Sequence, residues 1–157
     1  MQRSLMKVQK PQFIEGIQWR KLSASERNGR PWKYELIEGV AVKFKEMICV
    51  ESCYLLDGDG MCWGSITPHQ ITVSRNYQWN GSSCSPDLHG VLLSSVVHDL
   101  LYQFSGAPRF PLSRKFADDL FYSLATSRLA FLYRAGLLVG GWTCWGQHEP
   151  GAHIISP

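Results

Sequence analysis

A histidine, two aspartates and a tyrosine form the set of side chains in this sequence that is best suited to chemistry. His98, Asp99 and Tyr102 lie in one stretch, roughly from Asp87 to Phe104, that is expected to be a helix. His98 and Tyr102 are four residues apart, so their side chains share one helix face. Asp99 points about 100° away from His98 and faces whatever flanks the helix.

A second predicted helix brings Asp118 toward this face. The linker between the helices, residues 105–112, is short, so the helices are expected to be antiparallel neighbours. His98 precedes the linker by about as many residues as Asp118 follows it, which places both at a similar height, roughly 9 Å from the turn. A carboxylate that holds one nitrogen of a histidine leaves the other nitrogen to accept a proton from water. The spacing therefore predicts a general base, His98, oriented by Asp118.

Asp99 suggests a role in metal binding. With loop carbonyls from around Trp79 to Ser83, its carboxylate could bind a hard cation that polarises a carbonyl or phosphoryl oxygen. The same residues also admit a purely structural interpretation. His98 and Asp118 would then only join two helices, and Arg114 with Asp118 would be a surface ion pair.

The elements that must position these residues follow from the apolar patterns. Strands are expected at 34–44, 48–56, 61–66 and 70–77, with Asp57-Gly-Asp-Gly60 as a hairpin turn. The second helix is expected to begin after an N-cap at Ser113 and to run to about Tyr133 or Leu138. The predicted fold class is α+β, in which an N-terminal antiparallel strand region packs on two long antiparallel helices resembling the helix pair of phospholipase A2.

The length of 157 residues fits a single domain. Its predicted parts are an N-terminal arm (1–33), a strand region (34–78), the motif loop with the helix pair (79–142) and a tail (143–157). A net charge of +3 with dispersed positive residues makes nucleic-acid binding unlikely as a function class. The five cysteines are expected to be free thiols. Neither a secretion signal nor a transmembrane segment is predicted.

Three motifs occur in order along the chain. They are Gly-x-Ser-x-x-Pro within 77–86, His-Asp-x-Leu-Tyr within 97–102, and Ser-Arg-x-x-Ala-Asp-x-x-Phe over 113–121. Together they resemble a family of tailed bacteriophages and prophages, domain of unknown function 1353, over about residues 60–142. The resemblance implies a phage setting, in the host cytoplasm or the virion, and names no activity.

The helix motif also resembles secreted phospholipases A2, in which a glycine-containing loop precedes a His-Asp-x-x-Tyr helix and an antiparallel helix supplies a second aspartate. This resemblance implies that His98 is the general base and that Tyr102 and Asp118 orient it. It implies a calcium ion held by Asp99 and by carbonyls near three loop residues, Trp79, Gly81 and Ser83.

The function that these two resemblances imply is that of a phage- or prophage-encoded, metal-assisted hydrolase of lipids or other esters. Two alternatives remain open. One is a non-catalytic virion component of the tail, neck or baseplate, which would bind other phage structural proteins and expose an apolar patch that includes Trp142 and Trp145. The other is a small phage protein that binds and inhibits a host enzyme or defence system.

Overall fold

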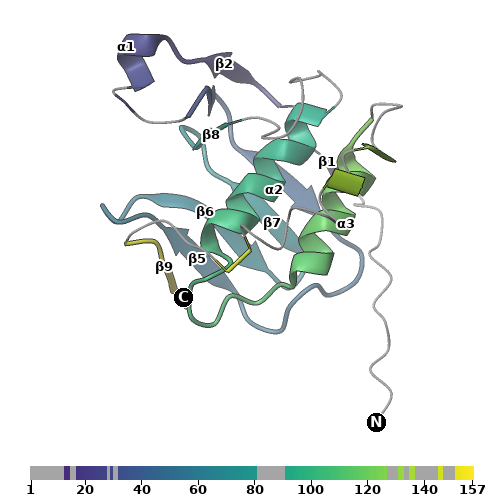
Figure 1. The fold of residues 1–157 in the computed structure, drawn as a ribbon. Coiled ribbons are helices and arrows are strands. Elements are labelled where there is room, and N and C mark those ends of the chain that lie inside the picture. The colour runs from purple at the N-terminus through teal and green to yellow at the C-terminus, as the bar shows by residue number, and fades with distance from the viewer. Residues whose placement is uncertain are drawn as a thin grey trace.

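A six-stranded antiparallel sheet is the largest element of the computed structural model, which describes residues 13–14, 17–27, 29, 32–80, 91–126, 131–132, 135–136, 145–146 and 151–157. Across the sheet the strands follow the order β1-β4-β7-β6-β5-β9. They span β1 (Phe13–Ile14), β4 (Val40–Lys43), β7 (Gln70–Val73), β6 (Cys62–Thr67), β5 (Cys53–Leu56) and β9 (His153–Ile155). Strands from opposite ends of the chain therefore form the two edges (Figure 1).

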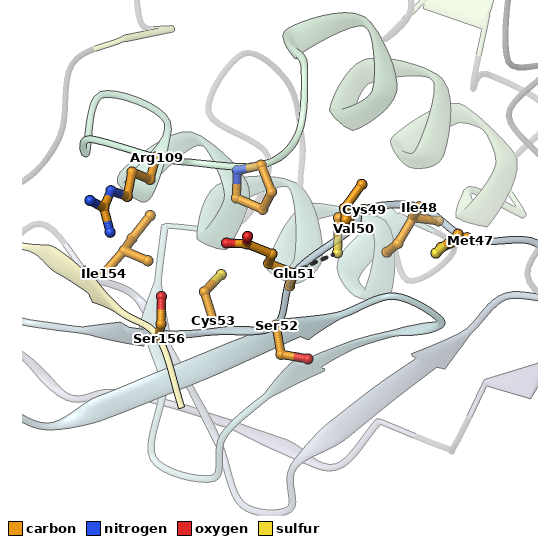
Figure 2. Close-up of a pocket in the computed structure, with 11 residues that line it drawn as sticks. Met47, Ile48, Cys49, Val50, Glu51, Ser52, Cys53, Arg109, Ile154 and Ser156 are labelled. Carbon is orange, nitrogen blue, oxygen red and sulfur yellow. Dashed lines mark hydrogen bonds between the residues drawn. The ribbon is translucent and has the colours of Figure 1, made fainter.

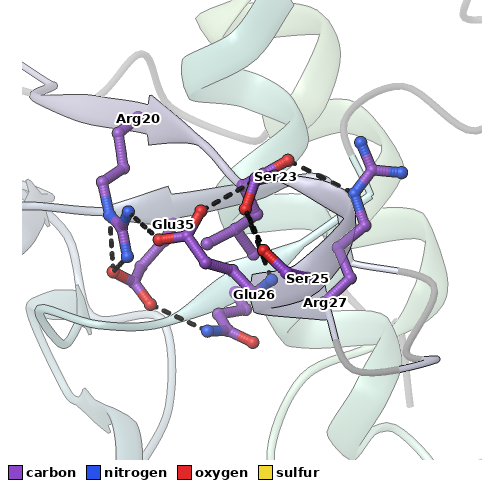
Figure 3. A network of polar contacts seen from close by, with 8 residues as sticks. Arg20, Ser23, Ser25, Glu26, Arg27 and Glu35 are labelled. Carbon is purple, nitrogen blue, oxygen red and sulfur yellow. Dashed lines mark hydrogen bonds and ion pairs between the residues drawn. The ribbon is translucent and has the colours of Figure 1, made fainter.

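A smaller antiparallel sheet of three strands combines β2 (Trp19–Lys21), β3 (Tyr34–Leu36) and β8 (Gln78–Trp79). Between β2 and β3 lies the short helix α1 (Ala24–Arg27). Its first turn is closed by reciprocal hydrogen bonds, because Ser23 N donates to Glu26 and Glu26 N donates to the Ser23 hydroxyl. Arg20 pairs with both Glu26 and Glu35 and ties this turn to the sheet (Figure 3).

Two helices, α2 (Leu92–Phe104) and α3 (Arg114–Leu124), lie side by side in front of the large sheet (Figure 1). The core lies between α2 and the sheet, where inward-facing residues of the central strands, among them Val42, Ile66 and Ile71, are fully buried. At Gly64 the helix approaches closely, since a Cβ there would lie 2.8 Å from Leu100 Cδ2 and 2.5 Å from the Thr72 carbonyl oxygen. Gly64 thus fixes how near α2 lies to β6.

The predicted fold class was wrong. Strands dominate the described chain, in two antiparallel sheets, and the helices are short elements of 13 and 11 residues rather than a long phospholipase-A2-like pair. The second helix ends at Leu124, not near Tyr133 or Leu138, because Ala125 has extended backbone angles. The apolar residues beyond it continued the helical period in sequence, but a period does not show where a helix stops.

The expected strand at 34–44 was also wrong as a single element. The chain leaves the small sheet after Leu36 and enters the large sheet at Val40, so the two halves belong to different sheets. Within the arm predicted for residues 1–33, the described residues include strands of both sheets. Long-range pairing, which no local pattern encodes, decides both outcomes.

Several local predictions are confirmed. The first helix ends at Phe104, and Ser113 is the N-cap of α3, its hydroxyl accepting a hydrogen bond from Phe116 N. The expected start of the first helix, at Asp87, lies outside the described residues. The hairpin turn at 57–60 joins β5 to β6, and Asp57 Oδ1 accepts hydrogen bonds from Asp59 N and Met61 N.

Candidate active site

His98 and Asp118 are a buried pair of titratable side chains, 7% and 6% exposed. His98 lies on α2 and Asp118 on α3, where the N-cap at Ser113 sets the start of the helix. His98 Nε2 lies 3.0 Å from Asp118 Oδ1, which is hydrogen-bonding distance. The structure thus brings together the two residues that the sequence placed at equal heights on facing helices.

The carboxylate of Asp118 interacts with three side chains. Its Oδ1 also accepts a hydrogen bond of 2.6 Å from the Tyr102 hydroxyl. Its Oδ2 lies 3.9 Å from Nε of Arg114, one turn earlier on the same helix. Arg114 was expected only as one half of a surface ion pair, whereas its side chain is 30% exposed and lies beside a buried carboxylate.

Hydrogen bonding determines which nitrogen of His98 can act as a base. Asp118, as a carboxylate, accepts hydrogen bonds, so Nε2 carries a proton and Nδ1 is the acceptor in the neutral ring. Nδ1 lies on the side of Asp99, 3.9 Å from its Oδ1. The arrangement gives a histidine of fixed tautomer with its basic nitrogen next to a second carboxylate.

Burial and neighbouring charges act in opposite directions on the pKa of His98. Burial alone lowers the pKa, because it disfavours the charged imidazolium. Hydrogen bonds and charge interactions with Asp118 and Asp99 together outweigh burial and raise the pKa above its usual value. His98 is therefore a stronger base than an ordinary histidine, and it requires a higher pH to be neutral.

Aromatic rings surround the pair. The ring of Tyr102 lies 4.1 Å from that of His98, and Phe121 packs edge-on against His98 at 5.3 Å. Trp145 packs edge-on against Tyr102 at 5.0 Å, and Gly146 N donates to the Ser105 hydroxyl. The virion alternative predicts an exposed apolar patch that includes Trp145, but this residue is partly buried against the helix pair. Trp142 lies outside the described residues.

Only two of the four predicted cation ligands, Asp99 and Trp79, are among the described residues. The Asp99 side chain is 20% exposed beside His98 Nδ1. Trp79 lies in β8, where its carbonyl accepts a hydrogen bond from Lys33 N and its indole donates to Ser95. One lone pair of that carbonyl is thus already engaged. Gly81 and Ser83 lie outside the described residues, and within the described ranges no group of three or more His, Cys, Asp or Glu could hold a metal ion.

Comparisons with known proteins found no matching family model, curated protein or solved structure. The two resemblances drawn from the motifs therefore stay predictions. In the part of the chain that the structure describes, no helix has the length and apolar character needed to cross a bilayer.

Proposed function

We propose that this chain is a phage- or prophage-encoded hydrolase of lipids or other esters, with His98 as its general base. One observation carries the proposal: Asp118 Oδ1 accepts hydrogen bonds from both His98 Nε2 and the Tyr102 hydroxyl, at 3.0 and 2.6 Å. These contacts fix the tautomer that leaves Nδ1 basic. The order of the three motifs supports the phage setting.

The proposed reaction is general-base hydrolysis. Nδ1 of His98 accepts a proton from water as the water oxygen attacks the ester carbonyl. Asp118 stabilises the imidazolium that forms, and Tyr102 and Phe121 hold the ring in place. The imidazolium then returns its proton to the departing alkoxide, so the enzyme ends in its starting state.

Metal assistance is a separate part of the proposal. Asp99 is the residue that would hold a cation next to Nδ1, and a bound cation would supply polarisation of the ester carbonyl. Calcium takes six to eight oxygen ligands, and the described residues offer little beyond this carboxylate. The steps above therefore do not depend on a metal.

Hydrolysis is tested with chromogenic esters of short and medium acyl chains and with phospholipid vesicles, each with and without calcium. We expect His98→Asn to lower kcat/KM by about 100-fold or more, while His69→Asn, a change at an exposed histidine, leaves kcat/KM unchanged. Thermal melting shows whether each variant is folded. No turnover by the wild-type protein on any substrate would refute the hydrolase proposal.

Metal assistance is tested by calorimetry with calcium on the wild type, Asp99→Asn and Asp59→Asn. Saturable binding that Asp99→Asn removes and that Asp59→Asn, in the exposed hairpin turn, retains would support it. Absence of binding combined with a large loss of stability in Asp99→Asn would make Asp99 a structural residue.

A second candidate function is protein binding without catalysis, as a virion component or an inhibitor of a host protein. Exposed apolar side chains favour it, above all Val50 at 84% and Met61 at 58% exposed. Self-association in solution or co-purification with phage particles, retained in His98→Asn, would support this function over hydrolysis.

A further inference from the structure

A pocket of about 480 Å³ opens at the edge of the large sheet. Three parts of the chain form it: the loop between β4 and β5 together with the first residue of β5, the turn between α2 and α3, and strand β9 with the residue after it (Figure 2). None of the residues that line it belongs to the group of His98, Tyr102 and Asp118. It is therefore a separate feature that the proposed hydrolysis does not use.

Two opposite charges occupy this pocket without pairing. Figure 2 shows the guanidinium of Arg109 and the carboxylate of Glu51 coming from different segments, with no bond drawn between them. Both side chains are exposed, and among the described residues neither forms an ion pair. The pocket thus offers one site for an anionic group and one for a cationic group.

The remaining wall is apolar or uncharged. Its apolar side chains are Met47, Ile48, Val50, Pro111 and Ile154. The buried thiol of Cys53 also lines the pocket, and burial raises its pKa to about 11, so it is uncharged at neutral pH. An apolar group between two charged ends would find contacts along this wall.

The backbone of Arg109 has an unusual conformation in the turn that lines the pocket. Arg109 has a φ of 67°, in the left-handed region that residues other than glycine seldom adopt. Hydrogen bonds on either side of it, from Ala107 N to Phe104 O and from Phe110 N to Ala107 O, fix the turn. The turn therefore presents Arg109 to the pocket at a conformational cost.

From this combination we infer that the pocket binds a small zwitterion with an apolar side chain, of the α-amino acid class. Arg109 receives the carboxylate, Glu51 receives the ammonium group and the apolar wall receives the side chain. Guanidinium and carboxylate fit each other through two parallel hydrogen bonds. Because both charges are exposed, binding is expected to be weak and to weaken further with salt.

The test is calorimetry at low salt with L-leucine and L-phenylalanine, each compared with its N-acetyl and methyl-ester derivatives. Blocking either charge is expected to weaken binding to the wild type by about fivefold. Glu51→Gln should bind the free amino acid and its N-acetyl derivative equally well. Arg109→Asn should bind the free amino acid and its methyl ester equally well. Asparagine suits position 109 because it tolerates a positive φ.

Controls separate this site from the other one and from nonspecific effects. Glu46→Gln, an exposed residue of the same loop that does not line the pocket, should bind like the wild type. His98→Asn should also bind like the wild type, so loss of hydrolysis and loss of this pocket are distinguishable. O-phosphoethanolamine, a zwitterion without an apolar side chain, should bind more weakly than L-leucine.

Three outcomes would overturn the inference. One is no binding of either amino acid to the wild type at about 10 mM, a concentration that would nearly saturate a site with a Kd of about 1 mM. Another is equal binding of the free and blocked forms by the wild type. The third is tighter binding of O-phosphoethanolamine, which would assign the pocket to a lipid headgroup instead.

Discussion

At the scale of single residues, the buried cluster on α2 and α3 combines one histidine with carboxylates on both sides of its ring. Asp118 contacts Nε2 at 3.0 Å, and Asp99 lies 3.9 Å from Nδ1. A buried charge is costly unless it is paired, so the stability and the basicity of His98 depend on the same contacts. Measurements of stability therefore report on the geometry proposed for catalysis.

The first prediction concerns the charge of Asp118. Asp118→Asn keeps the shape of the side chain but removes its charge, so we expect the free energy of unfolding to fall by about 2–3 kcal/mol. The pKa of His98 should fall, since burial lowers it and Asp118 no longer opposes that effect. Urea unfolding and NMR titration measure the two effects. Asp59→Asn, in the exposed turn, should change stability by no more than about 0.5 kcal/mol, and an equal loss there would contradict the prediction.

The second prediction concerns the Tyr102 hydroxyl, which donates to Asp118 at 2.6 Å. Tyr102→Phe should lower the free energy of unfolding by about 1–2 kcal/mol, because it removes one hydrogen bond to a charged, buried acceptor. Tyr54→Phe makes the same change at a side chain that is 43% exposed and should be nearly neutral. Chemical denaturation of both variants tests this, and similar values for the two would count against a strong Tyr102 bond.

The third prediction is a dependence of stability on pH. The pKa of His98 is raised in the folded protein, so protonated His98 stabilises the fold. This stabilisation is fully present below the unfolded pKa of about 6.5 and is lost as pH rises through the folded pKa. The stability difference between the wild type and His98→Gln should therefore shrink with pH above about 6.5. Urea unfolding of both proteins from about pH 6 to about pH 9 measures this. A difference that stayed constant would show that the pKa of His98 is the same in the folded and the unfolded protein.

At the scale of elements, the position of α2 depends on the absence of a side chain at Gly64. A Cβ there would lie 2.5 Å from a carbonyl oxygen of β7 and 2.8 Å from Leu100, closer than atoms can approach without movement. Because α2 carries His98, a shift of this helix would also displace the site. The close packing of helix and sheet is thus a condition for the geometry of the site.

The fourth prediction follows from this contact. Gly64→Ala should destabilise the protein by about 1–3 kcal/mol, as overpacking of a core does. Gly136→Ala makes the same substitution where nothing lies within 4 Å, so it should be neutral or slightly stabilising. Thermal melts compare the two, and a harmless Gly64→Ala would mean that α2 does not lie this close to β6.

At the scale of the whole molecule, the large sheet is completed by residues far apart in the chain. Strand β9 pairs with β5 through Tyr54–Ile155, Leu55–Ile154 and Leu56–His153. Ala152, just before β9, is buried in the core. This strand covers an edge of β5 that would otherwise offer unpaired backbone groups to other chains.

The fifth prediction tests this role. Deletion of residues 151–157 should lower the melting temperature by several degrees and promote self-association, because it exposes the β5 edge and part of the core. Deletion of Pro157 alone, which follows the strand, should have neither effect. Thermal melting and light scattering measure both, and an unchanged melting temperature in the longer deletion would show that β9 adds little to the fold.

The sequence by itself determined the features that depend on short separations. The four-residue spacing of His98 and Tyr102 and the short linker to α3 were enough to place both beside Asp118. The N-cap at Ser113 and the hairpin turn at 57–60 were equally predictable. Helix periodicity, capping and turn chemistry act within a few residues, so a single sequence contains them.

Only the tertiary structure decided which distant segments pair. It divided 34–44 between two sheets, ended α3 at Leu124 and packed Trp145 against Tyr102. It also placed Arg109 and Glu51 at one pocket. Strand pairing and side-chain packing depend on the sum of many long-range contacts, and these leave no regular spacing in the sequence from which they could be read.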